Sequence, residues 1–352
     1  MHMADALLAP AVAATMYAAS AVTVGASVKT LRKDETTAKL PTMAVTSALV
    51  FAGQMINYTI PGTGSSGHLC GGMMLTALLG PQAGFLSMVV ILAIQALFFA
   101  DGGLLALGAN CWNMAFYGCF VGYYLLWRPM MRSKLFGASR SAVRAKITLA
   151  SILGCVLTLQ LGAFSVVLET TASGITELPF GAFVGIMQPI HLAIGLVEGL
   201  ITSAVLVFVY EARPELLMDV NAAGKDAGKY SLKTTLVILA VVVVIVGGGL
   251  SLFASGNPDG LEWSMFGNAE SGYSENMGLD EESYGVSSGA AEVAGAVQEK
   301  TAFLPDYAFA GNDSAAGTSV SGLLGSAIVA GAAVLVCMAG GFFRKRKAAV
   351  NT

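Results

Sequence analysis

Long apolar runs alternate with short polar segments along the whole chain. Each run is nearly free of charge and most approach the roughly 20 residues that a helix needs to cross a bilayer. Because a bilayer offers no water to the backbone, such runs are typical of membrane-spanning helices. The third is short and is expected to begin in a non-helical stretch. The pattern predicts an all-α polytopic membrane protein with nine spans, at 6–27, 42–60, 69–80, 84–100, 105–127, 146–168, 180–210, 233–255 and 320–343.

Composition agrees with this prediction. Of the 352 residues, 55% are hydrophobic and 12% are charged, against about 25% charged in soluble proteins. The five cysteines lie in or beside apolar segments without a CxxC pair, so they indicate small residues of the membrane core rather than disulfides or a zinc site. They are Cys70, Cys111, Cys119, Cys155 and Cys337.

The basic residues set the predicted orientation. Eighteen of the nineteen lie in four groups, within 29–39, 128–146, 213–233 and 344–347. With nine spans all four groups fall on one side, which the positive-inside rule makes cytoplasmic. The N-terminus is then outside and the C-terminus cytoplasmic. No basic residues precede the first apolar run, so we expect no cleaved signal peptide, and His2 is too large for removal of Met1.

The chain divides into two parts of different character. Residues 1–211 form a block of seven spans, 212–232 a cytoplasmic linker, 233–343 two spans around a long outer loop, and 344–352 a basic cytoplasmic tail. Half of the carboxylates lie in the outer loop, 256–319, where Lys300 is the single basic residue. This loop is interpreted either as a solvated, partly disordered segment or as one that attracts cations or docks on the first block.

A histidine at position 2 offers an unusual chelate. The α-amine of Met1 and the amide and imidazole nitrogens of His2 can close fused rings around one ion. A fourth nitrogen would complete the tetragonal geometry of Ni(II) or Cu(II). The chain has only three histidines, and His68 ends a Gly/Ser-rich stretch on the predicted outer side. The sequence therefore favours a metal site formed by Met1, His2 and His68. The alternatives are that histidine stands at position 2 by chance, at roughly its background frequency, and that His68 is an exposed loop histidine without a role.

Further polar residues are candidates for a supporting shell. His191 and Glu198 lie two helical turns apart in one span, where ionisable groups face the bundle interior. Asp5 is a candidate for capping the first span or orienting the ligands. Two amide pairs near the outer ends of spans, Gln54 with Asn57 and Asn110 with Asn113, either line the site or join helices by hydrogen bonds.

Missing motifs narrow the function. The chain has no GxxxxGK[ST] phosphate loop, no HExxH and no serine-nucleophile elbow, so ATP binding and familiar hydrolase chemistry are not indicated. A transporter component, rather than an enzyme, is expected, and energy for uphill transport must come from another subunit or an ion gradient.

Three segments resemble one known family. The opening Met-His-Met-Ala-Asp-Ala-Leu-Leu, the loop ending in Gly67-His68, and Pro189-Ile190-His191-Leu192-Ala193-Ile194-Gly195 are similar to the substrate-binding membrane component (S component) of nickel/cobalt energy-coupling-factor (ECF) transporters. The segment Pro258-Asp259-Gly260-Leu261-Glu262 resembles the PDGLE signature of that family's accessory subunit. The resemblance covers nearly the whole chain, and fusion of the two parts is similar to the nickel branch.

The resemblance implies the rest of the assignment. It implies a seven-helix bundle that captures Ni(II) or Co(II) as transported substrate through the Met1 amine, the His2 amide and imidazole, and His68, with no bound nucleotide. It also implies a transmembrane coupling subunit, a cytoplasmic ATPase pair and a bacterial or archaeal plasma membrane. Nickel against cobalt stays open, including a cobalt importer that supplies cobalamin biosynthesis. A self-contained secondary cation transporter and a membrane metalloenzyme are the rival classes.

Overall fold

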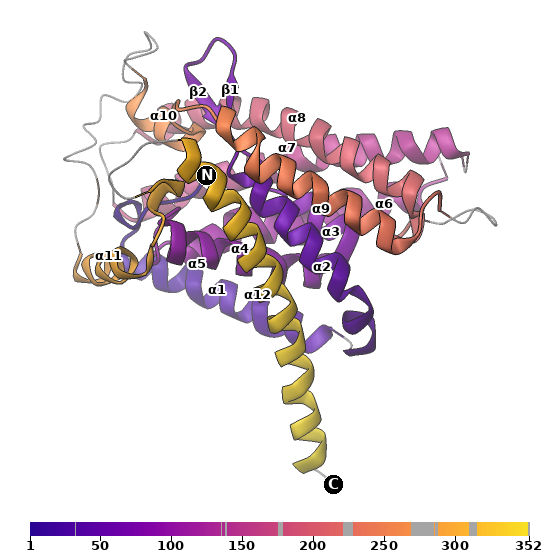
Figure 1. Cartoon of the computed structure of the whole chain (residues 1–352). Coiled ribbons are helices and arrows are strands. Elements are labelled where there is room, and N and C mark those ends of the chain that lie inside the picture. Colours follow the sequence, from indigo (N-terminus) through magenta and orange to yellow (C-terminus); the bar gives the residue numbers. More distant parts are fainter. Residues whose placement is uncertain are drawn as a thin grey trace.

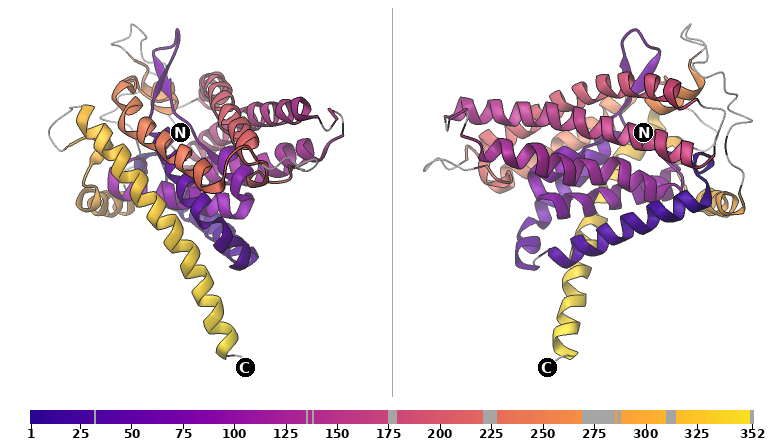
Figure 2. Two further views of the ribbon diagram at one scale, coloured as in Figure 1. Left: turned by 45° about the vertical axis from the view of Figure 1, so that its right-hand side comes forward. Right: turned by 180° about the vertical axis from the view of Figure 1, so that it is seen from behind.

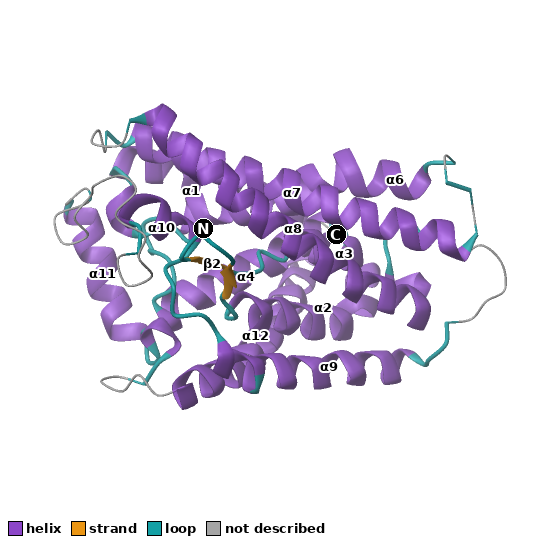
Figure 3. Ribbon diagram, turned by 90° about the horizontal axis from the view of Figure 1, so that it is seen from above, coloured by secondary structure: helices purple, strands orange, loops and turns teal. Residues whose placement is uncertain are grey.

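Most helices run between two ends of the molecule, where the chain reverses (Figures 1 and 3). The computed structural model describes residues 1–31, 33–134, 136–137, 139–174, 179–220, 228–268, 285, 288–309 and 315–350. The N-terminus, a small hairpin, α10 and α11 gather at one end, and α6 with the neighbouring ends of α8 and α9 lies at the other (Figure 3). This arrangement groups the predicted outer elements apart from the predicted cytoplasmic ones.

The first part of the chain forms a helical bundle around the short central helix α3. Pro10 and Pro81 stand at helix starts, where a missing N–H has no cost, and the Ser139 side chain caps α7. Its elements are η1 (Asp5–Leu7), α1 (Pro10–Thr30), α2 (Lys33–Gln54), β1 (Tyr58–Ile60), β2 (Ser65–Gly67), α3 (Gly72–Leu79), α4 (Pro81–Phe99), α5 (Leu107–Asn110), the π-helical η2 (Cys111–Val121) and η3 (Tyr123–Trp127), α6 (Arg128–Arg132), α7 (Arg140–Ala172) and α8 (Phe180–Ala212).

The second part adds two long helices and several short ones. Its elements are η4 (Pro214–Leu216), α9 (Leu232–Gly248), η5 (Leu250–Phe253), α10 (Gly260–Phe266), α11 (Gly289–Thr301), η6 (Pro305–Tyr307) and α12 (Ala315–Val350). α9 and α12 contact each other and α2, and the C-terminal half of α12 projects beyond the bundle (Figures 1 and 2).

Six helices in the described part of the chain are long and apolar enough to cross a membrane. They are Pro10–Thr30, Pro81–Phe99, Arg140–Ala172, Phe180–Ala212, Leu232–Phe253 and Ala316–Val336. The other three predicted spans are also helical, but a local feature of each keeps it out of this group of six long apolar helices. α2 begins in a charged segment, α3 has only 8 residues, and the 105–127 region is divided among α5, η2 and η3.

The predicted span 42–60 is wrong at its end. α2 stops at Gln54, and Tyr58–Ile60 pairs antiparallel with Ser65–Gly67 as a two-stranded hairpin. Tyr, Thr and Ile favour extended structure when a partner strand is present. The partner follows a turn with positive φ at Gly62 and Gly64. The hairpin ends directly before His68 and therefore fixes where that residue lies.

Close helix contacts depend on small residues. A Cβ on Gly195 or Gly199 of α8 would lie 2.9 Å or 2.6 Å from backbone atoms of Val156 or Ile152 on α7. In membranes such small residues let backbones approach, and the packing of the approach stabilises the pair. α7 and α8 thus form one tightly joined antiparallel pair, with His191 and Glu198 on the buried face of α8.

The segment 256–319, which the sequence predicts to lie outside, contains short helices. α10, capped by Asp259 and Glu262 in a capping box, packs on α8 and β2, and α11 contacts α4 and η1. The interpretation as a docking segment is therefore confirmed for these helices. The acidic stretch 269–284 lies outside the described residues, so its predicted disorder stays a prediction.

Candidate metal centre

Hydrogen bonds of the Met3 backbone and of the Asp5 side chain hold the N-terminal segment inside the molecule. The Asn110 side chain accepts from Met3 N at 2.8 Å and donates to Met3 O at 3.2 Å, and Gly103 N also donates to Met3 O at 2.9 Å. Asp5 accepts from Ala106 N at 3.1 Å. A Cβ on Gly103 would overlap the Asp5 carboxylate, so only glycine allows this approach.

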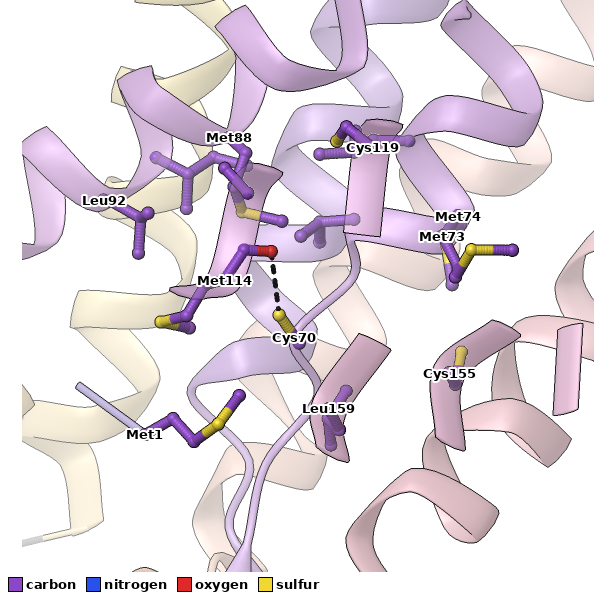
Figure 4. Close-up of a cluster of buried hydrophobic side chains, with 14 of the residues drawn as sticks. Met1, Cys70, Met73, Met74, Met88, Leu92, Met114, Cys119, Cys155 and Leu159 are labelled. Atoms are coloured by element: carbon purple, nitrogen blue, oxygen red, sulfur yellow. Dashed lines mark hydrogen bonds between the residues drawn. The ribbon is translucent and has the colours of Figure 1, made fainter. Parts of the chain in front are cut away.

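The Met1 side chain is an apolar anchor. It is buried beside Cys70, Met114 and Leu159 (Figure 4). A Cβ on Gly162 would lie 3.2 Å from the Met1 methyl group. Burial of a methionine side chain contributes about 1.5–3 kcal/mol, which fixes the first residue although it is a chain end.

The His2 and His68 imidazoles lie face to face. Their ring centroids are 5.1 Å apart and the rings are inclined by 22°. His2 Nδ1 is 3.1 Å from Asp101 Oδ1, and His68 Nδ1 is 3.0 Å from the Leu69 carbonyl oxygen. His2 Nε2 is buried and has no hydrogen-bond partner among the described residues. The N-terminal segment and the loop after β2 thus place two imidazoles together.

The Met1 amine contacts the second part of the chain. Its ammonium lies 2.9 Å from Asp259 Oδ2, while Asp259 Oδ1 caps α10 through the N–H groups of Leu261 and Glu262. Burial raises the pKa of Asp259, but the Met1 ammonium, His68 and the N–H of Glu262 together outweigh burial and hold this pKa below its usual value. The aspartate of the PDGLE segment is therefore a charged partner of the chain terminus.

The loop that carries His68 is held by Glu198. The two carboxylate oxygens accept from Cys70 N at 2.8 Å and Gly71 N at 2.9 Å. Such charge-assisted bonds are the stronger class of hydrogen bond. His191 lies deeper, with Nδ1 bonded to the Met187 carbonyl of its own helix, and lines a small pocket with Met1 and His68.

Both imidazoles are uncharged over the physiological range. Burial, followed by repulsion from the Met1 ammonium, lowers the pKa of His2 to about 3. The same causes, with a contribution from His2, lower the pKa of His68 to about 4. The contact between His2 and Asp101 is therefore a hydrogen bond from a neutral ring. Neutral imidazole is also the form that binds metals.

The structure brings the main predicted residues together. The Met1 amine, His2 and His68 lie together. Glu198 and His191 lie next to them. Asp5 accepts a hydrogen bond from Ala106 N and thereby fixes the N-terminal segment that carries Met1 and His2. Asn57 lines a cavity beside His2, and its carbonyl oxygen accepts from Ser255 N at 2.7 Å.

Sequence reasoning gave no site role to Asp101 or Tyr307. Asp101 accepts from the Tyr307 hydroxyl, which is itself bonded by Gln95 Nε2. Asp101 follows directly on an apolar span, and a carboxylate at that position was a usable signal. The contact with Tyr307 was not predictable, since more than 200 residues separate the two along the chain.

Known families match both parts of the chain. The cobalt uptake substrate-specific transmembrane region (CbiM) matches residues 2–216, and the PDGLE domain matches residues 233–340. The chain belongs to the CbiM family. It is a nickel/cobalt transport component, a multi-pass membrane protein of the bacterial and archaeal type, and not an enzyme.

Relatives show the same two-part organisation in their names. The fused nickel transport protein NikMN of Archaeoglobus fulgidus, as that protein is named, is 35% identical to this chain over 332 residues. The match covers 94% of this chain and 95% of that protein. The fused nickel transport protein NikMN of Rhodobacter capsulatus is 32% identical over 62% of this chain and 64% of its own length. Among solved structures, a truncated transition metal transporter is 32% identical with a TM-score of 0.50. The match covers 60% of the chain described here and 99% of the transporter chain.

Proposed function

We propose that this protein captures Ni(II), or Co(II), outside the cell as the substrate-binding component of an ATP-driven ECF importer. Residues 1–211 form the seven-helix binding component and 233–343 the accessory part, joined by a cytoplasmic linker. Nine spans, an outer N-terminus and a cytoplasmic C-terminus belong to this proposal. The grouping of α10, α11 and the N-terminus at one end of the molecule supports it (Figure 3).

The observation that carries the proposal is the meeting of the chain terminus with two neutral imidazoles. The Met1 amine, the His2 amide and imidazole, and the His68 imidazole would hold the ion through four nitrogens. Ring centroids 5.1 Å apart suit two imidazoles on one ion, because metal–nitrogen bonds are about 2 Å long. Four nitrogens in a plane suit Ni(II).

Charge balance favours a divalent ion. Ligation requires a deprotonated amine and a deprotonated amide, whereas the Met1 ammonium is paired with Asp259 in the structure. One divalent ion then replaces two protons, which leave to water. The total charge around Asp101 and Asp259 stays the same.

Ligation also requires two local movements. His2 Nδ1, the nitrogen that closes a chelate ring with its own amide, faces Asp101, and the amine faces Asp259. The His2 ring must turn and the amine must leave its carboxylate. Glu198 and Asn110 would keep the two backbones in place meanwhile, as supporting residues do around metal sites.

The function implies partners. The described residues contain no nucleotide-binding loop, so a transmembrane coupling subunit and an ATPase pair would supply the energy. The rival reading as a secondary transporter is tested with liposomes that contain this protein alone. Nickel flux without the ATPase pair would contradict the proposal.

Titration with Ni(II) tests the ligand set directly. One glycine inserted between Met1 and His2 keeps every side chain but enlarges the chelate, so we expect one ion per native chain and at least a hundredfold weaker binding by the variant, about 2.7 kcal/mol. A glycine inserted between the exposed Phe136 and Gly137 is the matched control and should bind as the native protein does. Equal affinity of all three proteins would reject the N-terminal site.

A further inference from the structure

A cavity of about 680 Å³ lies between the N-terminal segment, the loop after α4 and the accessory part. It reaches His2 and His68, and it contains no lysine or arginine among its described lining residues. A hollow lined by one sign of charge concentrates ions of the opposite sign. Six carboxylates line it: Asp5, Asp101, Asp259, Glu262, Glu292 and Asp306.

Two buried polar side chains of the lining add independent support. His2, with a side chain 7% exposed, has no partner at Nε2, and Gln54, 3% exposed, has none at Oε1, among the residues that the structure describes. Buried polar atoms are nearly always hydrogen-bonded. Two such atoms beside one cavity therefore indicate that something polar occupies it.

Negative charge is crowded in the part of the cavity wall that contains Asp101 and Asp306. Burial and the neighbouring Asp101 carboxylate raise the pKa of Asp306. Asp306 and Tyr307 both adopt positive φ, at 50° and 59°, and this uncommon turn directs the two residues to the same cavity. A bound cation would relieve the repulsion that this arrangement creates.

The ligand is a cation that keeps its water. Among the described residues no three His, Cys, Asp or Glu side chains are close enough to hold an ion directly. A shell of six waters occupies about 180 Å³, at about 30 Å³ each, and fits the cavity. Small divalent cations commonly keep several waters and bind one or two carboxylates.

We propose that this cavity is a second binding site, which holds the hydrated divalent ion before the nitrogens of the N-terminus replace its water. The inference rests on the proposed function. Asp101 and Asp259 belong to both places, since each holds a nitrogen-bearing group of the capture site. An ion that attracts these two carboxylates weakens their hold on His2 and the Met1 amine. Arrival of the ion thus releases its own ligands.

Mn(II) is the probe of choice because it prefers oxygen ligands. The full chain in nanodiscs of zwitterionic lipid is titrated with Mn(II), and free Mn(II) is measured by electron paramagnetic resonance. The double variant Glu292→Gln/Asp306→Asn removes two charges from the cavity without touching the capture nitrogens. We expect its Mn(II) affinity to fall about tenfold, and its rate of Ni(II) binding to fall with it.

The matched control is Glu299→Gln, an exposed carboxylate of the same helix α11 that does not line the cavity. It should bind Mn(II) as the native chain does. If the double variant and the control bind Mn(II) equally, the cavity site is rejected. The glycine insertion between Met1 and His2 separates the two proposals, because it removes tight Ni(II) binding and leaves the Mn(II) site in place.

Discussion

At the scale of single residues, specific contacts hold the N-terminal segment inside the protein. Asn110 binds both the N–H and the carbonyl of Met3, much as a neighbouring strand would. The Met1 side chain is buried beside Cys70, Met114 and Leu159, and the amine lies against Asp259. A chain end is normally mobile, so the proposed role of the terminal amine as a metal ligand depends on these contacts.

Asn110→Ala tests this clasp. The substitution removes two hydrogen bonds to Met3 but no proposed ligand, and we expect Ni(II) affinity to fall about 10–100-fold, as for other supporting residues of metal sites. Competition against a chromophoric chelator measures the change. Thr30→Ala, at an exposed residue at the C-terminal end of α1 whose hydroxyl bonds to the Ala26 carbonyl of the same helix, is the control and should bind normally. Native affinity in Asn110→Ala would show that the clasp is dispensable.

The pH dependence of Ni(II) binding also follows from single residues. Because burial lowers the pKa of His2 to about 3 and that of His68 to about 4, both rings are already neutral above about pH 5 and do not compete with the metal. The amine and amide protons do compete. We expect affinity to fall as pH falls, by up to about a hundredfold per unit for two protons per ion. Titrations between pH 5.5 and about 8 measure the slope. If the affinity depended on a single proton, with its midpoint near the ordinary pKa of histidine, this account would be contradicted.

At the scale of elements, the accessory helices join the bundle through glycines. Gly322 of α12 lies against Gly247 of α9, where an added Cβ would meet the Gly247 carbonyl oxygen. Gly325 leaves room for Phe51 of α2 and Phe99 of α4. Ser321 Oγ donates to the carbonyl of Tyr307 at 3.0 Å, so the start of α12 also fixes the residue that binds Asp101. Packing of α12 is thereby linked to the geometry near His2.

Gly322→Ala should loosen this packing. Overfilling a close contact costs about 1–3 kcal/mol, and we expect a lower melting temperature of the detergent-solubilised protein. Gly331→Ala changes the same helix where nothing lies within 4 Å of the new Cβ, and it should melt as the native protein does. Equal melting of the two variants would mean that α9 and α12 do not pack through Gly322.

At the scale of the whole molecule, the two parts meet around the chain terminus. Asp259 from the accessory part binds the Met1 amine, Ser66 N donates to the Pro258 carbonyl at 2.8 Å, and Gln298 of α11 donates to the Gly102 carbonyl at 2.7 Å. These contacts lie at one end of the bundle, and the basic connections lie at the other. The proposed orientation places the first end outside.

Thiol labelling in intact cells tests that orientation. The described cysteines Cys70, Cys111, Cys119 and Cys155 are buried, so a Cys337→Ser background should label weakly. In it, Glu299→Cys should react with a membrane-impermeant maleimide from outside. Lys134→Cys, also exposed in the structure, should react only after the cells are opened. The reverse pattern would invert the topology.

The sequence by itself determined the membrane class, the helical fold, the family and the three residues proposed to hold the metal. Apolar runs favour transfer into the bilayer and basic clusters set the orientation, and both can be seen in short stretches of sequence. The chelate of Met1 and His2 is also local, because its nitrogens belong to two neighbouring residues. Tertiary structure decided what is not local: the hairpin that places His68, the π-helical break in 105–127, the clasp by Asn110, and the meeting of Met1 with Asp259. These depend on contacts between residues far apart in the chain, whose free energy exists only once the bundle has packed.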